Sequence, residues 1–484
     1  MKHETLCDAL NEISDPHISE AAASKKRVRL PWLGAIAAVL AAAILASALL
    51  PGRVPEPDDS IHLTNPDNIT HPGVNTPQSC LLASPVYPRM VKYSEVNHKA
   101  WRESLAQQYD QPDNYAAGTE EFFRSSIQTI LTDSSDNQTY SPLNVYMALA
   151  MLAEISDGSS RDQILGLLGA DSIKALRTQA EHMWNAHYRN DGLSTSVLAS
   201  SLWLENSLDY DPEVIQRLAQ NYYASVFRGD LGSDLANEML RSWLNEQTGG
   251  LLEAQVQGVE LSDRSNLALA TTIYYNVEWM DEFSEGKNTT GFFHGPAGDT
   301  EAVFMNRRMI DTYYRGDRFG AISLDLKDGG RMWLVLPEAG TSPAKLLENG
   351  QVLELLLDGR KDWEDKKDIL INLSVPKFDI VSDRDLIPSL EKLGITDVFD
   401  PEKANFCDLQ YEPEEYPYIS EVQHAARIAI DEKGVLAAAF TVAERNAAAA
   451  EIEDKVDFIL DRPFLFLIES QGGIPLFTGI VNTP

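Results

Sequence analysis

Apolar residues in the first third of the folded part of the chain recur at helical spacing. This pattern runs from Tyr109 to Leu131 and ends in a Ser/Asp/Asn cluster. Ser141-Pro142 then begins a second helix that includes the apolar run Val145–Leu152, because proline is favoured in a first helical turn. Asp157-Gly158-Ser159 interrupts the chain before another helical stretch that ends at Leu168. The pattern therefore predicts several helices before residue 170.

The pattern changes further along the chain, where short β-rich or apolar runs are bounded by turn residues. Six such runs are Val197–Leu204, Leu267–Tyr275, Met332–Leu336, Ile371–Phe378, Phe464–Ile468 and Leu476–Val481. Helices and strands do not alternate strictly. This order predicts an α+β fold with large mixed or antiparallel sheets rather than a doubly wound parallel sheet.

One segment contradicts its own local propensity. Residues 434–459 are rich in Ala, and by propensity they predict a helix after Gly434, but residues 435–443 have no polar face. Read with a period of two, one face carries only compact side chains: Val435, Ala437, Ala439, Thr441 and Ala443. A strand with such a face can enter between two others without overpacking the layer beneath. We therefore favour a loop that can become a strand over a permanent helix.

An uncharged stretch near the N-terminus, Leu30–Leu50, is long enough to span a bilayer. Four basic residues lie just before it within Lys25–Arg29, so residues 1–29 are predicted to be a short cytoplasmic tail and the rest is exported. Ala46-Ser47-Ala48 leaves open a cleaved signal peptide and a secreted protein. We favour an uncleaved transmembrane anchor at 30–50, followed by a flexible linker at 51–79 and a folded domain at 80–484.

The net charge of the 484-residue chain is −33. Residues 1–30 hold five basic and five acidic side chains, so the remainder carries 40 − 5 = 35 basic and 73 − 5 = 68 acidic ones. So acidic a surface repels phosphate backbones, which argues against nucleic acid as a partner. Cys7 precedes the predicted membrane segment, so only Cys80 and Cys407 could pair, and we expect isolated thiols.

Motifs that carry enzyme chemistry are missing from the sequence. It contains no G-x-S-x-G, H-E-x-x-H or P-loop pattern. His182 and His187 lie five residues apart, which is the wrong spacing for two ligands on one helical face. We therefore expect no catalytic residues, no metal and no cofactor, and predict that the protein is not an enzyme.

Several sequence blocks occur in the order typical of one known family. They include Ser141-Pro142-Leu143, Leu269–Trp279, Val375-Pro376-Lys377-Phe378, His424–Val442 with Asp431-Glu432-Lys433-Gly434, Asp461–Ile468 and Leu476–Pro484. Together they resemble serpins over roughly residues 80–484. The resemblance implies three β-sheets, about nine helices and an exposed reactive-centre loop. It implies that a serine protease cleaves this loop, which then inserts as a new strand into the large sheet and traps the enzyme.

The resemblance also assigns roles to individual residues. The implied hinge of the loop comprises Glu432, Gly434, Val435, Ala437, Ala439 and Thr441. The implied shutter, which controls opening of the sheet, comprises Asn137, Ser141, Thr271 and His424. Departures from the family pattern bear on the kinetics of opening rather than on the fold; these are Val435, Leu436, Phe440, Thr271 and Ala425.

The family's spacing from Glu432 places the reactive bond between Ala448 and Ala449, within the reactive-loop run Ala447–Ala450. A small residue there suits a protease with a shallow, elastase-like pocket. Arg445 is the alternative, and it would suit a trypsin-like enzyme.

These observations favour a suicide-substrate inhibitor of serine proteases, held as a monomer on the extracellular side of a bacterial cell membrane. The alternative is a non-inhibitory serpin that acts as a binding or structural module, whose loop never inserts.

Overall fold

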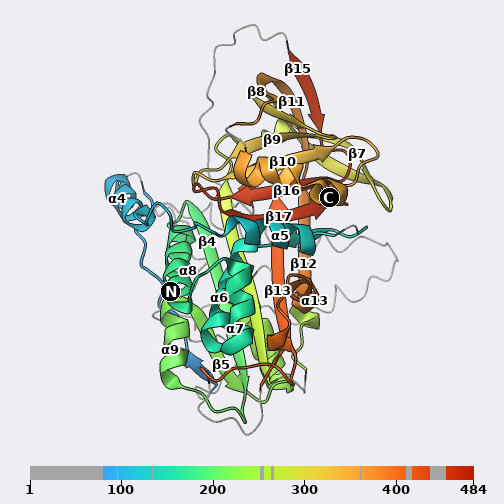
Figure 1. Cartoon of the computed structure of the whole chain (residues 1–484). Coiled ribbons are helices and arrows are strands. Elements are labelled where there is room, and N and C mark those ends of the chain that lie inside the picture. The colour runs from blue at the N-terminus through green and yellow to red at the C-terminus, as the bar shows by residue number, and fades with distance from the viewer. Residues whose placement is uncertain are drawn as a thin grey trace, which may run out of the picture. The chain divides into compact units, whose positions relative to one another are not determined.

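The computed structural model describes residues 80–94, 96–132, 134–250, 256–262, 266–359, 362–409, 417–435 and 454–484 (Figure 1). All of them belong to the second of the two units into which the chain divides, Leu63–Pro484, and the fold below is that of this unit alone. No helix among the described residues is long and apolar enough to cross a membrane. The predicted tail, anchor and linker, residues 1–79, lie outside the described residues.

The described residues contain ten α-helices, one more than the resemblance implied. They are α4 (His98–Tyr109), α5 (Glu120–Ile130), α6 (Pro142–Ile155), α7 (Gly158–Leu168), α8 (Ile173–His187), α9 (Pro212–Asn221), α10 (Asp234–Gln247), α11 (Pro343–Asn349), α12 (Gln351–Leu353) and α13 (Ile387–Lys392). The continuous helical pattern expected from Tyr109 to Leu131 is wrong between α4 and α5. Pro112 and Gly118, whose φ is +85°, lie in this interval and favour a loop.

The first sheet has eight strands. Their order across the sheet is β1 (Leu81–Ala83), β5 (Ala224–Gly229), β4 (Ser194–Glu205), β6 (Leu267–Glu278), β14 (Gly434–Val435), β13 (Ile419–Ile430) and β12 (Phe378–Asp385), and β3 (Arg189–Asn190) pairs with β4. Strands β4 and β6 pair antiparallel, whereas β6 and β13 pair parallel. The sheet is thus mixed, as predicted.

The second sheet has nine strands. Their order is β15 (Lys455–Ile459), β11 (Lys366–Pro376), β8 (Gly298–Gly316), β9 (Phe319–Asp325), β10 (Arg331–Pro337), β16 (Phe464–Glu469), β17 (Pro475–Val481) and β2 (Gln138–Tyr140), and β7 (Thr289–Gly295) pairs with β8. The expectation of three sheets is corrected to two for the described residues. The reason is the 19-residue β8, which pairs in turn with β7, β11 and β9 and so joins all nine strands.

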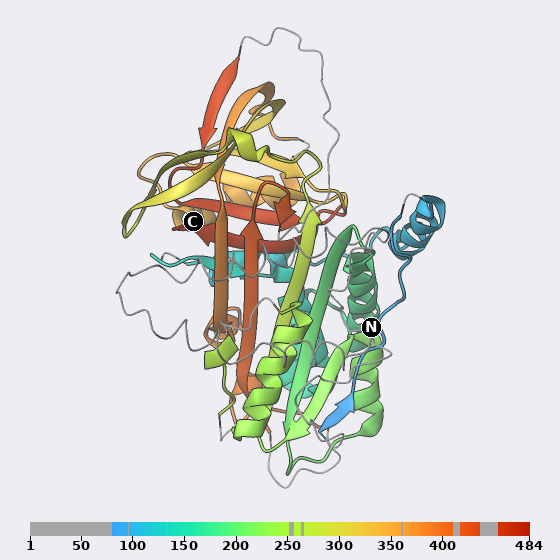
Figure 2. The same ribbon diagram turned by 180° about the vertical axis from the view of Figure 1, so that it is seen from behind.

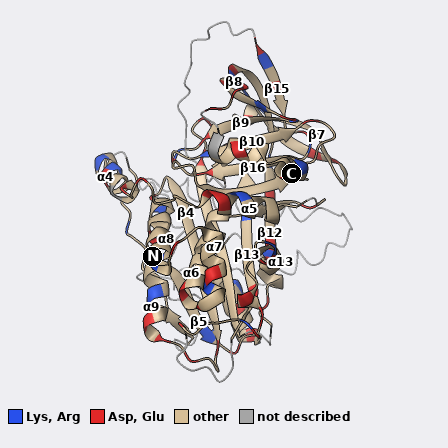
Figure 3. Ribbon diagram, viewed as in Figure 1, with Lys and Arg blue, Asp and Glu red and all other residues tan. Residues whose placement is uncertain are grey.

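The first sheet is covered on both faces. Helices α6 to α9 lie over one face, and α10 crosses the other, as Figures 1 and 2 show from opposite sides. The two faces bury separate apolar clusters; the smaller one packs Trp243 of α10 against Trp203 of β4 and Ala425 of β13. Charges lie mainly at element ends and loops (Figure 3), and β4 and β6 each carry one only at their last residue.

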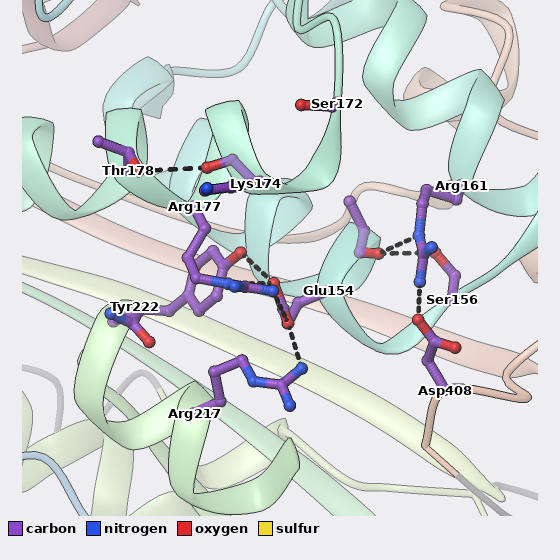
Figure 4. A network of polar contacts seen from close by, with 12 residues as sticks. Glu154, Ser156, Arg161, Ser172, Lys174, Arg177, Thr178, Arg217, Tyr222 and Asp408 are labelled. Carbon is purple, nitrogen blue, oxygen red and sulfur yellow. Dashed lines mark hydrogen bonds and ion pairs between the residues drawn. The ribbon is translucent and has the colours of Figure 1, made fainter. Parts of the chain in front are cut away.

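Helix α6 is the centre of the helical layer, and all of its residues are buried. Its N-cap is Ser141, whose hydroxyl accepts from the Asn144 N–H at 3.1 Å. Near its other end, the buried Glu154 carboxylate accepts hydrogen bonds from Arg177 of α8, from Arg217 of α9 and from the Tyr222 hydroxyl (Figure 4). This network ties three helices together behind the first sheet.

The strand predictions are confirmed with one exception. Five of the six predicted runs fall within β4, β6, β10, β16 and β17. The run Ile371–Phe378 is interrupted, because β11 ends at Pro376 and β12 begins at Phe378 as part of the other sheet. The described Cys80 and Cys407 are free, as expected.

Candidate functional site

The site is the turn at which the chain leaves β13 and re-enters the first sheet. After β13 ends at Ile430, the chain reverses at Asp431 and re-enters as the two-residue strand β14. The Asp431 carboxylate accepts hydrogen bonds from the backbone N–H groups of Lys433 at 2.8 Å and Gly434 at 3.2 Å, which fixes the turn. The beginning of the predicted hinge is therefore already a strand of the sheet.

Strand β14 lies between β6 and β13 (Figures 1 and 2). Gly434 pairs with Glu278, and Val435 pairs with Val277 on one side and Ile430 on the other. The Val435 side chain is fully buried in the main core. This is the face that the period-two pattern assigned to it.

Gly434 is required here by close approach of two backbones, and not by a turn. A Cβ atom on Gly434 would overlap the carbonyl oxygen of Val277 and lie 2.6 Å from Cα of Glu278. Only a residue without a side chain fits this position without displacing β6 or β14.

Glu432 fastens the turn to the second sheet. Its carboxylate, only 5% exposed as a residue, pairs with Lys377 at 2.5 Å and also accepts from the Asn288 amide. Burial acts to raise the pKa of Glu432, but these two hydrogen bonds outweigh it, so the pKa is lowered. Its backbone carbonyl accepts from the Phe283 N–H at 2.8 Å. The hinge therefore begins at a charged anchor on its outer side.

Below β14 the two neighbouring strands separate and then rejoin. The parallel ladder between β6 and β13 runs from Leu267/Ile419 to Thr272/Ala425. Residues 273–276 of β6 and 426–429 of β13 have no ladder partners in each other, and no other described strand lies between them. Among the described residues the sheet thus has a wedge, an unpaired stretch of β6 and β13 under β14, and a closed seam beneath it.

His424 lies at the closed seam and connects it to α6. Its Nε2 accepts from the Ser141 backbone N–H at 3.1 Å, so Nδ1 carries the proton and donates to Thr271 Oγ1 at 2.7 Å. Burial, and secondly the charge of Arg384, lower the pKa of His424 to about 3. The ring is therefore neutral at physiological pH. Three of the four predicted shutter residues, Ser141, Thr271 and His424, meet here.

The fourth, Asn137, lies elsewhere. Its side-chain oxygen accepts from the backbone N–H groups of Asn482 at 2.7 Å and Thr483 at 2.9 Å, and its amide donates to the Thr483 carbonyl at 2.7 Å. These are contacts with the C-terminal residues, so the structure does not bring Asn137 to His424.

Two residues at this site were not predicted from the sequence. Arg384 is the β12 partner of His424 across the ladder, and its guanidinium donates to the Ile130 carbonyl at 3.0 Å. Asn144 is fully buried in α6, and neither polar atom of its side chain has a hydrogen-bond partner among the described residues. The sequence does carry a sign of it, an amide among apolar residues in the first turn of a helix. Such a residue stands out because buried polar groups normally have hydrogen-bond partners.

The remaining predicted residues lie outside the described part of the chain. These are Ala437, Ala439 and Thr441 of the predicted hinge, and Arg445, Ala447, Ala448, Ala449 and Ala450 of the predicted reactive loop. The described chain resumes at Asp454, directly before β15 at the edge of the second sheet. The loop is thus bounded by β14 in one sheet and β15 in the other.

Comparison with known proteins agrees with this architecture. A family model described as serpin (serine protease inhibitor) matches residues 119–484. Serpin-Z1C of Triticum aestivum is 26% identical over 378 residues, which cover 74% of this chain and 93% of that protein.

Two solved structures show the same fold. The thermophilic serpin tengpin in its native state has a TM-score of 0.68 at 23% identity, covering 83% of this chain and 98% of that one. Arabidopsis AtSerpin1 in its native stressed conformation has a TM-score of 0.64 at 24% identity, covering 79% of this chain and 98% of that one. Because the family model spans most of the sequence, the chain belongs to the serpin family, whose members are generally protease inhibitors and not enzymes.

Proposed function

We propose that this protein is a suicide-substrate inhibitor of serine proteases with small primary pockets. The protease serine attacks the Ala448 carbonyl and releases the Ala449 amine, leaving an acyl-enzyme. The severed loop then enters the first sheet and displaces the bound enzyme before water can hydrolyse the ester.

The partly open wedge under β14 is the observation that carries this proposal. Continuing the register of Val435 opposite Val277, residues 436–439 would pair with residues 276–273 of β6. The same four positions would face residues 426–429 of β13, which are not paired with β6. Further entry requires the β6–β13 ladder around Thr271 and His424 to separate. Insertion thus extends a strand that has already begun.

The side chains on the entering strand fit the layer beneath. In the period-two pattern Ala437, Ala439 and Thr441 follow Val435 on the face that points into the core. None of them is bulky or charged, so they can be buried without overpacking. The four alanines 447–450 of the predicted reactive loop would suit an elastase-like pocket wherever in that run the bond falls.

The proposal is tested by incubating the full chain with pancreatic elastase. We expect a covalent complex on a denaturing gel and a rise in the Tm of the cleaved inhibitor. Cleavage without a complex and without a rise in Tm would exclude inhibition by insertion. That result would favour the alternative, a binding or structural module.

Single substitutions test the direction of the inserted face. Ala437→Arg and Ala439→Arg should each convert the inhibitor into a substrate, because a charge would have to be buried beneath the sheet. The matched control is Ala438→Arg, which lies on the opposite face and should keep most of the inhibition. Complex formation by both inward variants at the rate of the native chain would show that the face is assigned wrongly.

We also propose that the inhibitor is a monomer held outside a bacterial cell membrane. The uncharged run 30–50 and the basic residues before it support this placement. The exported side is where secreted proteases would meet the loop.

A further inference from the structure

A polar cavity lies away from the hinge, where the first sheet meets two turns of the second sheet. Its volume is about 310 Å³. It is enclosed by the end of α8, the start of β3 and β4, the β9–β10 turn and the β16–β17 turn. Its lining includes Tyr109, Tyr115, Arg189, Ser196, Asp328 and Leu476. The cavity is near the lower limit for small-molecule sites, which suits a compact ligand.

Arg189 is the cation of this cavity, and 6% of its surface is exposed. One guanidinium nitrogen contacts Asp191 Oδ2 at 3.4 Å, and the group lies 4.6 Å from the centre of the Tyr109 ring. Burial lowers the pKa of Arg189, and the charges of Asp191 and Asp328 oppose that effect. A guanidinium has five N–H donors, so a single long ion pair leaves most of them free to bind a carboxylate.

Asp328 is the anion of the cavity. One oxygen accepts from the Tyr275 hydroxyl at 2.8 Å and the other from the Gly330 N–H at 2.8 Å. Burial raises the pKa of Asp328. A bound cation would therefore stabilise its charged form. A ligand with only a negative charge, bound to Arg189, would be repelled by Asp191 and Asp328. A ligand with only a positive charge, bound to Asp328, would be repelled by the buried Arg189.

Ser196 supplies the independent sign that the cavity accepts a polar ligand. The residue is 4% exposed and lines the cavity, and its hydroxyl has no hydrogen-bond partner among the described residues. A buried hydroxyl without a partner is unfavourable, and rotation of the Ser196 side chain toward a ligand atom in the cavity would remove that cost. His187, by contrast, is satisfied, since its Nδ1 donates to the Met183 carbonyl at 2.6 Å and its Nε2 accepts from Ser470 at 3.0 Å.

His187, Ser470, Gln471 and Gly472 also line the cavity, and the rest of its wall is apolar. Tyr109, Tyr115 and Leu476 lie on it, and Ala186 of α8 adds a small side chain. This wall could contact an aliphatic or aromatic group of a few carbon atoms. The cavity therefore offers the Arg189 guanidinium to a ligand carboxylate, the Asp328 carboxylate to a ligand ammonium group, and an apolar surface to the rest of the ligand.

We propose that this cavity binds a free α-amino acid with an apolar side chain. Its carboxylate binds Arg189, its ammonium group binds Asp328, and Ser196 completes the hydrogen bonds while the side chain contacts the tyrosines. A zwitterion matches both buried charges without adding net charge. A ligand with only one of the two groups leaves one of them unpaired, which is costly in a buried site.

The test compares three probes of one shape on the full chain by calorimetry and thermal shift. These are L-phenylalanine, 3-phenylpropionate, which lacks the ammonium group, and phenethylamine, which lacks the carboxylate. We expect L-phenylalanine to bind and raise the Tm, and each of the other two to bind at least about tenfold more weakly. Equal binding of either analogue, or no binding of L-phenylalanine or L-leucine at about 10 mM, would overturn the proposal.

Two variants locate the binding. Arg189→Gln should weaken L-phenylalanine at least about tenfold, through loss of the charged fork. Ala186→Phe should abolish binding by filling the cavity, and its matched control is Ala175→Phe, on an exposed position of the same helix α8. If the Ala186→Phe variant binds L-phenylalanine as tightly as the native chain and the control is folded, the amino acid binds elsewhere and the proposed site is wrong. This outcome decides the matter even if Arg189→Gln fails to fold.

Discussion

At Gly434 the backbones of β14 and β6 run so close that an added Cβ would overlap Val277 O and lie 2.6 Å from Cα of Glu278. At His424 two hydrogen bonds fix a neutral ring between α6 and β6. Both residues are buried, and both lie where the sheet would open in the proposed insertion. Each constraint leads to a measurable effect.

Replacing the hinge glycine tests the close approach. Gly434→Ala should destabilise the native fold by about 1–3 kcal/mol, because β14 must move away from β6. Urea unfolding measures the change. Gly166→Ala is the control, since a Cβ there meets nothing within 4 Å and its helix gains up to about 1 kcal/mol. A Gly434→Ala protein as stable as the native one would contradict the model of a fixed β14.

The pKa of His424 predicts acid sensitivity. The folded pKa of about 3 lies below the unfolded value near 6.5, so between these limits the unfolded chain binds more protons. This contribution to stability is complete above about pH 6.5 and is lost as pH falls toward 3. His424→Gln should therefore reduce the slope of unfolding free energy against pH, between pH 5 and 6, by about 1 kcal/mol per pH unit. An unchanged slope would show that the ring is not buried as a neutral group.

At the scale of elements, one buried carboxylate joins three helices of the layer behind the first sheet. Glu154 of α6 accepts from Arg177 of α8 at 2.6 and 3.0 Å and from Arg217 of α9 at 2.8 Å. The charge of Glu154 also contributes, after burial, to raising the pKa of Tyr222 well above its usual value. The three helices are therefore joined behind the first sheet, in which β6 and β13 would separate during the proposed insertion.

Removing that charge should loosen the layer. Glu154→Gln leaves two arginines without their shared partner and should cost about 3–5 kcal/mol of unfolding free energy. The control is Glu103→Gln, which breaks the exposed Lys99–Glu103 pair of α4 at 3.8 Å and should cost less than about 1 kcal/mol. Chemical denaturation of both variants decides the matter. Equal losses would mean that the network does not join the helices.

At the scale of the whole molecule, the proposed inhibition depends on one loop that joins two sheets. The described chain leaves the first sheet at Val435 and returns at Lys455 of the second, so cleavage between them would free the strand that is proposed to enter. Helix α10 crosses the face over which that strand would pass (Figure 2). In the proposed insertion, α10 would therefore have to move relative to the apolar cluster that it shares with Trp203.

The proposed anchor makes a prediction at this scale. The full chain expressed in bacteria should remain with membranes after alkaline carbonate washing, and deletion of residues 30–50 should retain it in the cytoplasm. External protease should reach the folded domain in intact spheroplasts. A soluble exported product shortened by about 48–50 residues would instead identify a cleaved signal peptide and contradict the anchor.

Much of the fold was predictable from local patterns. Pro142 and the apolar run after it predicted α6, and the small period-two face predicted a loop that can become a strand, of which Val435 already belongs to the buried β14. The family resemblance assigned Ser141, Thr271 and His424 to one shutter, and in the structure hydrogen bonds link His424 to the other two. It also grouped Asn137 with them, but Asn137 binds the C-terminal residues instead.

By itself the sequence determined the α+β class, the strand-capable hinge and the absence of recognisable enzyme motifs, because spacing and side-chain size are local properties. Only the tertiary structure decided that β14 already lies between β6 and β13, that β8 joins all nine strands of the second sheet, and that Arg189 and Asp328 share a cavity. Those facts depend on contacts between residues far apart in the sequence, such as Val277 with Val435, Phe304 with Pro376, and Arg189 with Asp328 in one cavity. Such contacts are set by packing of the whole core and not by any one segment.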